Sequence, residues 1–468
     1  MIFTSLTFWG FFALTFAVYW LLLRHRGQNI FLLLASYIFY GWFHPWYPVM
    51  LGASTLADFF LARRMRADRE RTKWYMALSL SLNLGVLAFF KYYNFFNAQA
   101  AEALTSAGLR VDWLFVNIFL PAGLSFYTLK KLAYMIDVSR GSLEPSDDLV
   151  GFALFVSFFP QIVAGPIDRY QKLIPQIQRE RIWQPGFFYA AWPLLVTGFF
   201  KKIVVADTLK SVVDRIFALS EPSMVLIIAG ALGFTLEILA DFSAYTDLSR
   251  GIAQLLGYNT SENFNKPYLS LTPTEFWNRW HITLSTWLRD YVFFPIRRAL
   301  LKRTYSLPAR LSMSIPPLVT MFISGLWHGA GLTFVVWGVY YGVLIAGYQL
   351  AGLRGDWKPA GHLKTFFAWL IMFTFIVFGW LIFRAPSMSW LLDVFRSAEW
   401  AHSRSDWVVA LIILSMTVAY SLPLIVKHLL DQYIPRRGLA HSVYYAALTL
   451  GTVIFTSSVT SDFIYFQF

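Results

Sequence analysis

A histidine inside an apolar, glycine-rich run is the residue of this sequence best placed for chemistry. His328 lies in the stretch Met321-Phe-Ile-Ser-Gly-Leu-Trp-His-Gly-Ala-Gly331. Burying an imidazole in such surroundings is unfavourable unless the ring is hydrogen-bonded or lines a wet cavity. Gly325, Gly329 and Gly331 remove side-chain bulk nearby, so another helix, a backbone or a ligand can come close. The pattern favours a catalytic role for His328 over a packing role.

A second candidate is His281, at the end of the aromatic stretch Phe276-Trp-Asn-Arg-Trp-His281. The preceding Thr272-Pro-Thr-Glu275 is typical of a helix start, with threonine as the N-cap, proline in the first turn and glutamate completing a capping box. His281 is then either a hydrogen-bonded structural histidine or a second polar wall of a reaction centre at membrane depth. One helix running from there to Pro295 would present Trp277, His281, Leu284, Leu288 and Tyr291 on a single face.

The other histidines lie at segment ends or in polar loops, where snorkelling or solvation is a sufficient explanation. The sequence has no glycine-rich phosphate loop followed by lysine, no Gly-x-Ser-x-Gly elbow and no His-Glu-x-x-His helix. It also has no cysteine, which excludes disulfides, thiolate zinc sites and a cysteine nucleophile. We therefore expect no metal site and no tightly bound cofactor. The six histidines set aside are His25, His44, His362, His402, His428 and His441.

Two polar clusters interrupt apolar runs elsewhere in the chain. Asp241-Phe-Ser-Ala-Tyr-Thr-Asp247 has carboxylates that can pair with Arg250 or with the histidines, or it is a helix end that enters the lipid headgroups. Lys201-Lys202 is most simply an interfacial anchor. The sequence leaves the role of the first cluster open and favours an interfacial role for the second.

The composition is that of a helical membrane protein. Of the 468 residues, 57% are hydrophobic, 19% are aromatic and only 14% are charged. Apolar runs of spanning length recur from one end of the chain to the other. The 39 Lys and Arg against 26 Asp and Glu give a net charge of +13, which the positive-inside rule and anionic lipid headgroups explain without nucleic acid. The sequence predicts an all-α polytopic protein in contact with membrane lipid.

The apolar runs predict about ten or eleven transmembrane helices in one membrane domain, residues 1–468. No basic residue precedes the first run and Arg24-His-Arg26 follows it, so we expect an uncleaved span with its N-terminus outside. Two shorter runs, 30–43 and 47–62, are expected to be kinked or paired. The longer runs are 3–23, 74–96, 116–137, 186–206, 224–241, 311–326, 332–350, 366–383, 407–426 and 443–459.

Several segments between these runs carry their own predictions. The prolines and glycine of 158–166 indicate a broken or re-entrant segment. The amphipathic pattern of 207–220 favours a helix lying along the membrane interface. The basic segments 63–73 and 169–181 are expected in the cytoplasm, and 98–112 is expected to be an external loop.

An ordered set of motifs resembles those of the membrane-bound O-acyltransferases, and specifically of the bacterial branch that acetylates exopolysaccharides such as alginate and cellulose. Single pieces of this kind are weak, but the whole set occurs in order along essentially the entire chain. The pieces are Asn29–Tyr40, Pro121–Tyr127, Tyr134–Arg140, Phe159–Pro166, Asp241–Asp247, Glu275–Tyr291, Gly325–Gly331, Phe378–Ala385 and Phe463–Phe468.

The resemblance implies a ring of helices around a central funnel in the bacterial inner membrane. It also implies that His328 is the catalytic histidine and His281 the second motif histidine. His328 would act as a general base toward an acceptor hydroxyl or accept the acyl group itself. Dry aromatic walls would hinder hydrolysis of the acyl donor.

The resemblance further implies a donor and partners. An acyl thioester, acetyl-CoA, would approach from the basic cytoplasmic face, where its phosphates would meet residues such as Arg169, Lys172, Arg297 and Arg298. The acetyl group would leave on the external side, to a partner protein or carrier associated with a polysaccharide synthesis complex.

Three rival functions remain open from the sequence. The same funnel would suit a non-enzymatic polysaccharide or lipid transporter. The same chemistry would suit O-acetylation of peptidoglycan or D-alanylation of teichoic acid. Acylation of a lipid or sterol fits the motif set less well.

Overall fold

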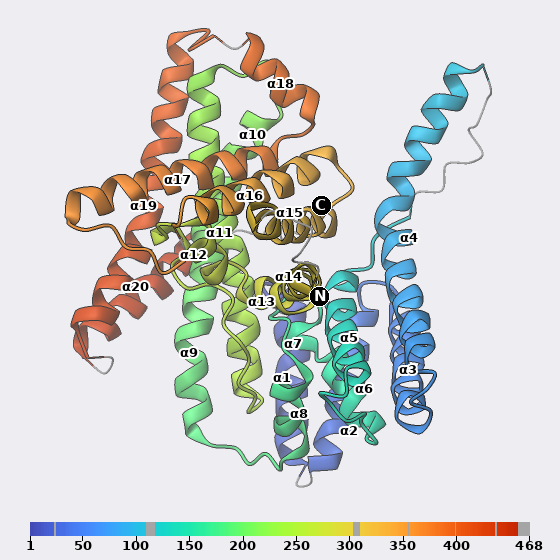
Figure 1. The fold of residues 1–468 in the computed structure, drawn as a ribbon. Helices are drawn as coiled ribbons and strands as arrows, with labels where there is room; N and C mark the ends of the chain where they lie inside the picture. The colour runs from blue at the N-terminus through green and yellow to red at the C-terminus, as the bar shows by residue number, and fades with distance from the viewer. Residues whose placement is uncertain are drawn as a thin grey trace. The chain divides into compact units, whose positions relative to one another are not determined.

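The computed structural model describes residues 1–22, 25–108, 118–302, 309–353, 355–397, 399–435 and 438–456. These residues form helices joined by turns and loops, and none of them lies in a β-strand (Figure 1). The predicted all-α class is therefore confirmed. The piece 463–468, which contributes to the family resemblance, lies outside the described residues.

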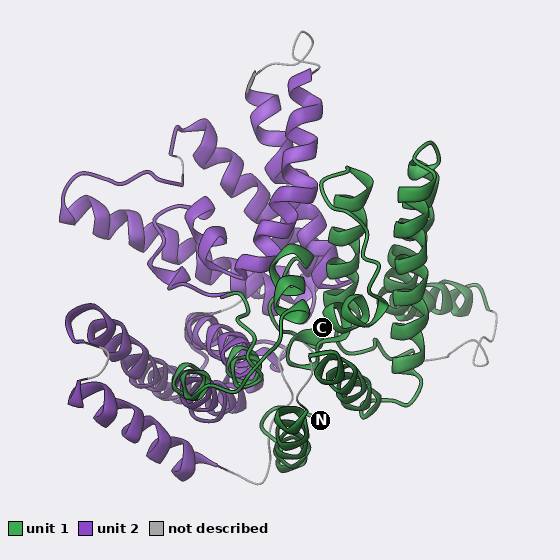
Figure 2. Ribbon diagram, turned by 90° about the horizontal axis from the view of Figure 1, so that it is seen from below, with its two compact units in different colours: residues 1–191, 249–261 green, residues 192–248, 262–468 purple. Residues whose placement is uncertain are grey.

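The chain divides into two compact units (Figure 2). Unit 1 consists of residues 1–191 and 249–261, and unit 2 of residues 192–248 and 262–468. That the whole chain is one membrane domain stays a prediction.

The first eight helices lie in unit 1. Helices α1 to α8 are Leu6–Leu21, His25–Gly41, Tyr47–Ala67, Thr72–Ser106, Leu124–Ser139, Leu149–Ser157, Phe159–Ile162 and Tyr170–Gln178.

The later helices carry most of unit 2, and α9 and α11 each pass from one unit to the other. Two of these later segments are π-helical, Phe200–Ala206 and Arg289–Phe293. Helices α9 to α20 are Pro185–Phe199, Asp207–Phe217, Met224–Leu255, Pro273–Arg279, Ile282–Leu288, Phe294–Lys302, Ala309–His328, Leu332–Leu350, His362–Arg384, Met388–Ser397, Arg404–Tyr433 and Leu439–Phe455.

Six helices of the described chain are long and apolar enough to cross a membrane, which confirms a polytopic protein. Two further apolar helices, α1 and α20, are shorter. Some of the ten or eleven expected spans correspond to short or broken helices. In the expected span 116–137, for example, helix α5 begins only at Leu124. The six helices are Thr72–Ser106, Pro185–Phe217, Met224–Leu255, Leu332–Leu350, His362–Arg384 and Arg404–Tyr433.

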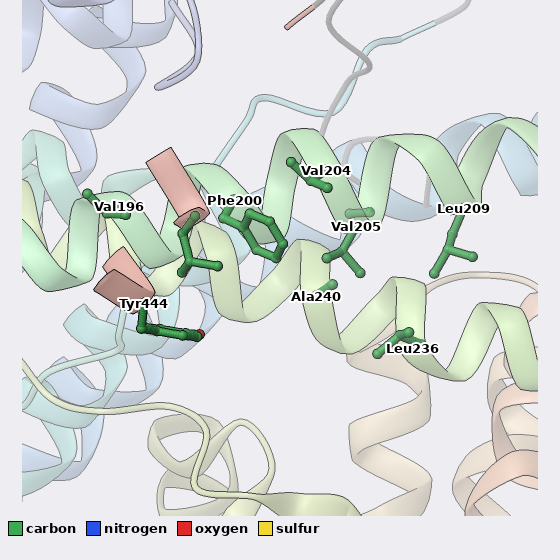
Figure 3. Close-up of a cluster of buried hydrophobic side chains, with 10 residues drawn as sticks. Val196, Phe200, Val204, Val205, Leu209, Leu236, Ala240 and Tyr444 are labelled. Atoms are coloured by element: carbon green, nitrogen blue, oxygen red, sulfur yellow. The ribbon is translucent and has the colours of Figure 1, made fainter. Parts of the chain in front are cut away.

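Helix α11 is the most deeply buried of these six. Within unit 2, it packs against α20 and against the part of the helix 185–217 that follows residue 191 (Figure 3). Small side chains such as Ala240 let the helices approach, and the larger ones fill the remaining space. The buried cluster comprises Val196, Phe200, Val204, Val205, Ala206, Leu209, Leu236, Ala240, Tyr444 and Leu448.

The prediction of a separate interfacial helix at 207–220 is wrong. A π-helix, Phe200–Ala206, joins α9 to α10 without a break, so that 185–217 is a single helix of 33 residues. The amphipathic pattern has a different cause, because the apolar side chains of α10, such as Leu209 and Val213, are buried inside the protein.

The predicted external loop at 98–112 is also corrected. Helix α4 continues to Ser106, and residues 109–117 lie outside the described part of the chain. At 1.5 Å per residue its 35 residues measure roughly 50 Å, which exceeds the hydrocarbon thickness of about 30 Å. Part of α4 therefore has to extend beyond the apolar layer.

The predicted break at 158–166 is confirmed. Helix α6 has nine residues, of which 151–157 are buried, and α7 has only four, all of them buried, within unit 1. Gly123 approaches this broken segment with a φ of 78°, and a Cβ added there would meet the carbonyl oxygen of Ile162. Only glycine combines that backbone angle with that proximity.

Candidate functional site

Helices α15 and α16 form the hairpin that carries His328. His328 is the last residue of α15, and Gly329-Ala-Gly331 connects it to the start of α16 at Leu332. Helix α16 begins and ends at the residues predicted from its apolar run. The residues around His328 and His281 described below belong to unit 2.

Glycines allow the two helices of the hairpin to touch through their backbones. A Cβ added to Gly325 would meet the carbonyl oxygen of Phe334 and would lie 3.3 Å from the Cα of Gly338. A Cβ on Gly329 would meet the Phe334 ring, whereas one on Gly331 would make an ordinary contact at 3.5 Å. The predicted close approach is therefore confirmed at Gly325 and Gly329, whereas the position of Gly331 could accommodate a Cβ atom.

Aromatic rings surround His328, whose exposed fraction is 7%. The imidazole centroid lies 4.9 Å from the Trp327 ring, 5.0 Å from the Trp337 ring and 5.3 Å from the Phe383 ring. Each of these rings is nearly perpendicular to the imidazole. Such walls exclude bulk water and strengthen hydrogen bonds and charges inside them.

His281 lies at a helix break that the sequence analysis did not predict. Helix α12 ends at Arg279, α13 begins at Ile282, and His281 between them has a φ of 42°. The expectation of one helix from 272 to 295 is therefore wrong, and the five side chains assigned to a single face do not share one helix. A left-handed backbone costs a non-glycine residue about 1–2 kcal/mol, so the surrounding contacts must hold it.

The predicted helix start at Thr272 is confirmed, with one difference in the backbone amide that Glu275 binds. The Thr272 hydroxyl accepts a hydrogen bond from the Glu275 amide at 3.1 Å. The Glu275 carboxylate accepts from the amide of Leu271 at 2.7 Å, one residue before the N-cap. It also pairs with Arg279 at 2.6 Å, which braces the short helix α12.

Asn263 fixes the start of α13 and thereby the position of His281. Its backbone carbonyl accepts from the Ile282 amide at 2.9 Å. Its side-chain oxygen accepts from the Thr283 amide at 3.1 Å and from the Thr283 hydroxyl at 2.7 Å. These bonds satisfy amides that a helix start would otherwise leave without acceptors. The break at His281 is thus imposed by a residue eighteen positions earlier.

The indole of Trp327 lies against both candidate histidines. Its ring centroid is 4.9 Å from that of His328 and 6.1 Å from that of His281. The other side of His281 packs on Phe242 of α11, at 4.7 Å. The structure therefore brings together the two histidines that the sequence singled out, with one tryptophan in contact with each.

The two polar clusters predicted separately are ion-paired with each other in unit 2. Lys202 lies 2.7 Å from Asp241 and 2.9 Å from Asp207, and Lys201 lies 2.8 Å from Asp247. Asp241 and Asp247 sit inside α11, so they do not mark a helix end. The buried pair of Lys202 also argues against a simple interfacial anchor.

The basic residues proposed for donor phosphates have different surroundings. Lys172 donates to the Ser261 hydroxyl at 2.6 Å and lies 3.6 Å from Asp168, within unit 1. Arg297 and Arg298 are exposed on α14 of unit 2. Their role in binding a donor stays a prediction.

In the described part of the chain, no group of three or more His, Asp or Glu side chains is arranged to hold a metal ion. The site around His328 consists instead of one imidazole, indole rings and a phenyl ring. This arrangement suits acid–base chemistry on an apolar substrate group.

Several residues near His328 were missed in the sequence analysis. Trp337 follows His328 by nine residues, inside a predicted span, and nothing in its spacing separates it from the other tryptophans. Phe383 comes from α17 and is brought there only by tertiary packing. The stretch Phe378–Ala385 was noted for its resemblance alone.

Comparisons with known proteins agree with the resemblance. A model of the membrane-bound O-acyltransferase family matches residues 146–383, just over half of the chain, and that range includes both histidines. The chain is 36% identical over 394 residues to a probable alginate O-acetylase of Pseudomonas aeruginosa, covering 83% of this chain and 73% of that protein.

More distant relatives have other named acceptors. The chain is 29% identical over 430 residues to a peptidoglycan O-acetyltransferase of Helicobacter pylori, covering 84% of this chain and 78% of that protein. It is 28% identical over 273 residues to a teichoic acid D-alanyltransferase of Bacillus subtilis, covering 57% of this chain and 69% of that protein.

Proposed function

Because the chain belongs to the membrane-bound O-acyltransferase family, we propose that it transfers an acetyl group from acetyl-CoA, taken from the cytoplasm, for O-acetylation of an exopolysaccharide of the alginate or cellulose type. It is an O-acyltransferase of the bacterial inner membrane. The observation that carries the proposal is the enclosure of the His328 ring by three aromatic rings, those of Trp327 and Trp337 on the α15–α16 hairpin and that of Phe383 on α17.

His328 is the general base of the proposed reaction. The neutral imidazole accepts the proton of an acceptor hydroxyl, whose oxygen forms a bond to the thioester carbonyl carbon. The carbon–sulfur bond then breaks, and the leaving thiolate takes the proton from the imidazolium. The products are an acetyl ester and free CoA, and no other reactant is needed.

His281 is the proposed positioning residue. Its ring packs on Trp327, which in turn packs on His328. A ring held in this way limits the orientations open to the base, and misplacing a catalytic group by about 1 Å can reduce a rate about 100-fold.

The degree of similarity supports a polysaccharide acceptor of the alginate type. The relative named as an alginate O-acetylase is 36% identical, against 29% for the peptidoglycan enzyme over a similar share of this chain. We propose that an extracytoplasmic partner protein receives the acetyl group and passes it to the polymer. Acetylated peptidoglycan or D-alanylated teichoic acid are the alternative products.

The test is a His328→Ala variant in lipid nanodiscs supplied with acetyl-CoA labelled in the acetyl group, together with membranes of the native host as acceptor. We expect transfer to fall at least 1,000-fold, because the base that activates the hydroxyl is lost. His362→Ala, at an exposed histidine at the start of α17, is the matched control and should retain full activity.

Chemical analysis of the labelled product identifies the acceptor. Label in uronic acid or glucose units supports the proposal, and label in muramic acid or teichoic acid replaces it with one of the alternatives. Undiminished transfer by His328→Ala would remove this histidine from the mechanism. Polymer flux without any acetyl turnover in the wild-type protein would favour the transporter.

A further inference from the structure

Two buried hydrogen-bond donors near His328 have no acceptor among the described residues. One is the hydroxyl of Ser324, which is 1% exposed and lies one turn before His328 on the same face of α15. Thr320, a turn earlier, bonds its hydroxyl to the carbonyl oxygen of Pro316 at 2.6 Å, as hydroxyls inside helices commonly do. Ser324 makes no such bond in the described chain, so its hydroxyl proton is available to another acceptor.

The second donor is the indole Nε1–H of Trp337 on α16. The ring is fully buried, and its centroid lies 5.0 Å from that of His328, at an interplanar angle of 83°. Within the described chain, Nε1 has no hydrogen-bond partner. Buried indole nitrogens usually have one, and leaving such a donor unsatisfied costs about 1–3 kcal/mol. The fully buried ring of Tyr341, one turn further along α16, packs against the indole at 5.4 Å.

Building on the acyl transfer proposed above, we propose that the Trp337 Nε1–H and the Ser324 hydroxyl bind the carbonyl oxygen of the acyl group beside His328. A carbonyl oxygen only accepts hydrogen bonds, and it has two lone pairs for two donors. One donor comes from each helix of the hairpin. Ser324 lies four residues before His328 on α15, and the Trp337 ring on α16 lies 5.0 Å from the imidazole. The pair acts as an oxyanion hole.

The proposed step places negative charge on the oxygen that these donors bind. When the acceptor oxygen attacks, the carbonyl double bond opens and its electron pair moves to the carbonyl oxygen. The two donors shorten their hydrogen bonds to this oxyanion. Its electron pair then re-forms the carbonyl double bond as the carbon–sulfur bond breaks, and the negative charge leaves on the thiolate. Donors already fixed in a dry site stabilise the oxyanion without reorganising.

Trp337→Phe and Ser324→Ala test the two donors separately. Each variant keeps most of the packing volume and removes one donor. We expect each to lower kcat by about 100- to 1,000-fold, the range for one oxyanion-hole donor, and to change KM for acetyl-CoA by less than about threefold. CoA release is measured with a thiol reagent in nanodiscs, since the protein has no cysteine of its own.

Trp277→Phe is the matched control. Trp277 is also a tryptophan whose Nε1 is buried without a partner in the described chain, and its ring contacts Trp337. We expect its kcat to stay within about twofold of wild type. Trp337→His, which retains a ring N–H, is expected to recover part of the activity that Trp337→Phe loses. An equal loss of kcat in Trp277→Phe and Trp337→Phe would overturn the assignment of Trp337.

A readout independent of turnover is the carbonyl stretch of a bound ketone analogue of acetyl-CoA carrying ¹³C at the carbonyl. Hydrogen bonding to two donors lowers this frequency in the wild-type protein, and Trp337→Phe and Ser324→Ala should each raise it. An unchanged frequency in both variants, or a loss of melting temperature with kcat intact, would show that the donors serve packing or a structural water.

The two proposals fail in different ways. If His328→Ala abolishes transfer while Trp337→Phe and Ser324→Ala retain wild-type kcat, the proposed function stands and the oxyanion hole is wrong. If His328→Ala retains transfer, the proposed function itself is wrong.

Discussion

His281 combines an imidazole with a backbone angle that few side chains adopt. Its φ of 42° is favourable for glycine, tolerable for asparagine and strained for alanine. A simple His281→Ala variant would therefore confuse a loss of chemistry with a loss of stability. Substitutions matched to the backbone separate the two effects.

We expect His281→Asn to fold with a melting temperature close to wild type and to lose at least 10-fold in acyl transfer, because Trp327 loses the ring against which it packs. His281→Ala should be less stable than His281→Gly by about 1 kcal/mol. Thermal unfolding in detergent, measured beside activity in nanodiscs, gives both quantities. Full activity in His281→Asn would assign this residue a structural role only.

The sequence singled out both histidines, but it predicted the surroundings of only one. The glycines around His328 indicated close packing, and Gly325 and Gly329 confirm it. The break at His281 could not be predicted because the capping residues and the helical period both continue through it. It depends on Asn263, whose bonds to Ile282 and Thr283 form only in the folded chain.

At the scale of helices, the contact between α15 and α16 leaves no room for a side chain at Gly325. Gly325→Ala would press a methyl group against the carbonyl oxygen of Phe334. Overpacking of this kind typically costs about 1–3 kcal/mol, and we expect a corresponding loss of thermal stability together with reduced acyl transfer.

Gly347→Ala is the control for this prediction. Gly347 lies in α16, and a Cβ there would meet nothing within 4 Å. Alanine favours a helix over glycine by about 1 kcal/mol in water, so this variant should be as stable as wild type or slightly more so. If Gly325→Ala unfolds no earlier than Gly347→Ala in a detergent melt, the two backbones have room to separate.

The ends of a helix were predicted well where its apolar run was uninterrupted. They were predicted poorly where one helix continues directly into the next. The bounds of α16 match the prediction to the residue. The continuity of 185–217 was missed because a π-helix shifts the period and makes one helix resemble two. The pairing of Lys202 with Asp241 was missed because the residues are 39 positions apart.

At the scale of the whole molecule, the sidedness of the donor follows from the orientation of α4. The basic segment before it is predicted to be cytoplasmic and its far end external. Glu70 and Ser106 are exposed at the two ends, and the natural chain has no cysteine. We expect a membrane-impermeant maleimide to label Ser106→Cys in spheroplasts and Glu70→Cys only after lysis.

The reverse labelling pattern would place the basic segment outside and contradict a cytoplasmic donor. Labelling of both positions in spheroplasts would mean that α4 does not cross the membrane. Composition predicted a polytopic protein correctly, and six helices of the described residues are long and apolar enough to span the membrane. Apolar side chains that pack inside the protein and those that face lipid are alike in sequence, as the buried residues 151–157 of α6 illustrate.

The backbone contact between Gly325 and Gly338 also restricts how the enzyme admits its donor. The two backbones meet at this point with no side chain between them, so separating the helices would break the contact, and we expect His328 and Trp337 to move together. Clearance for an incoming acyl chain must then come from rotation of the Trp327 indole or from a displacement of α17, which contributes Phe383. On the proposed mechanism, an aromatic side chain or a neighbouring helix therefore has to move to admit the substrate, while the His328 imidazole and the Trp337 indole keep their relative positions.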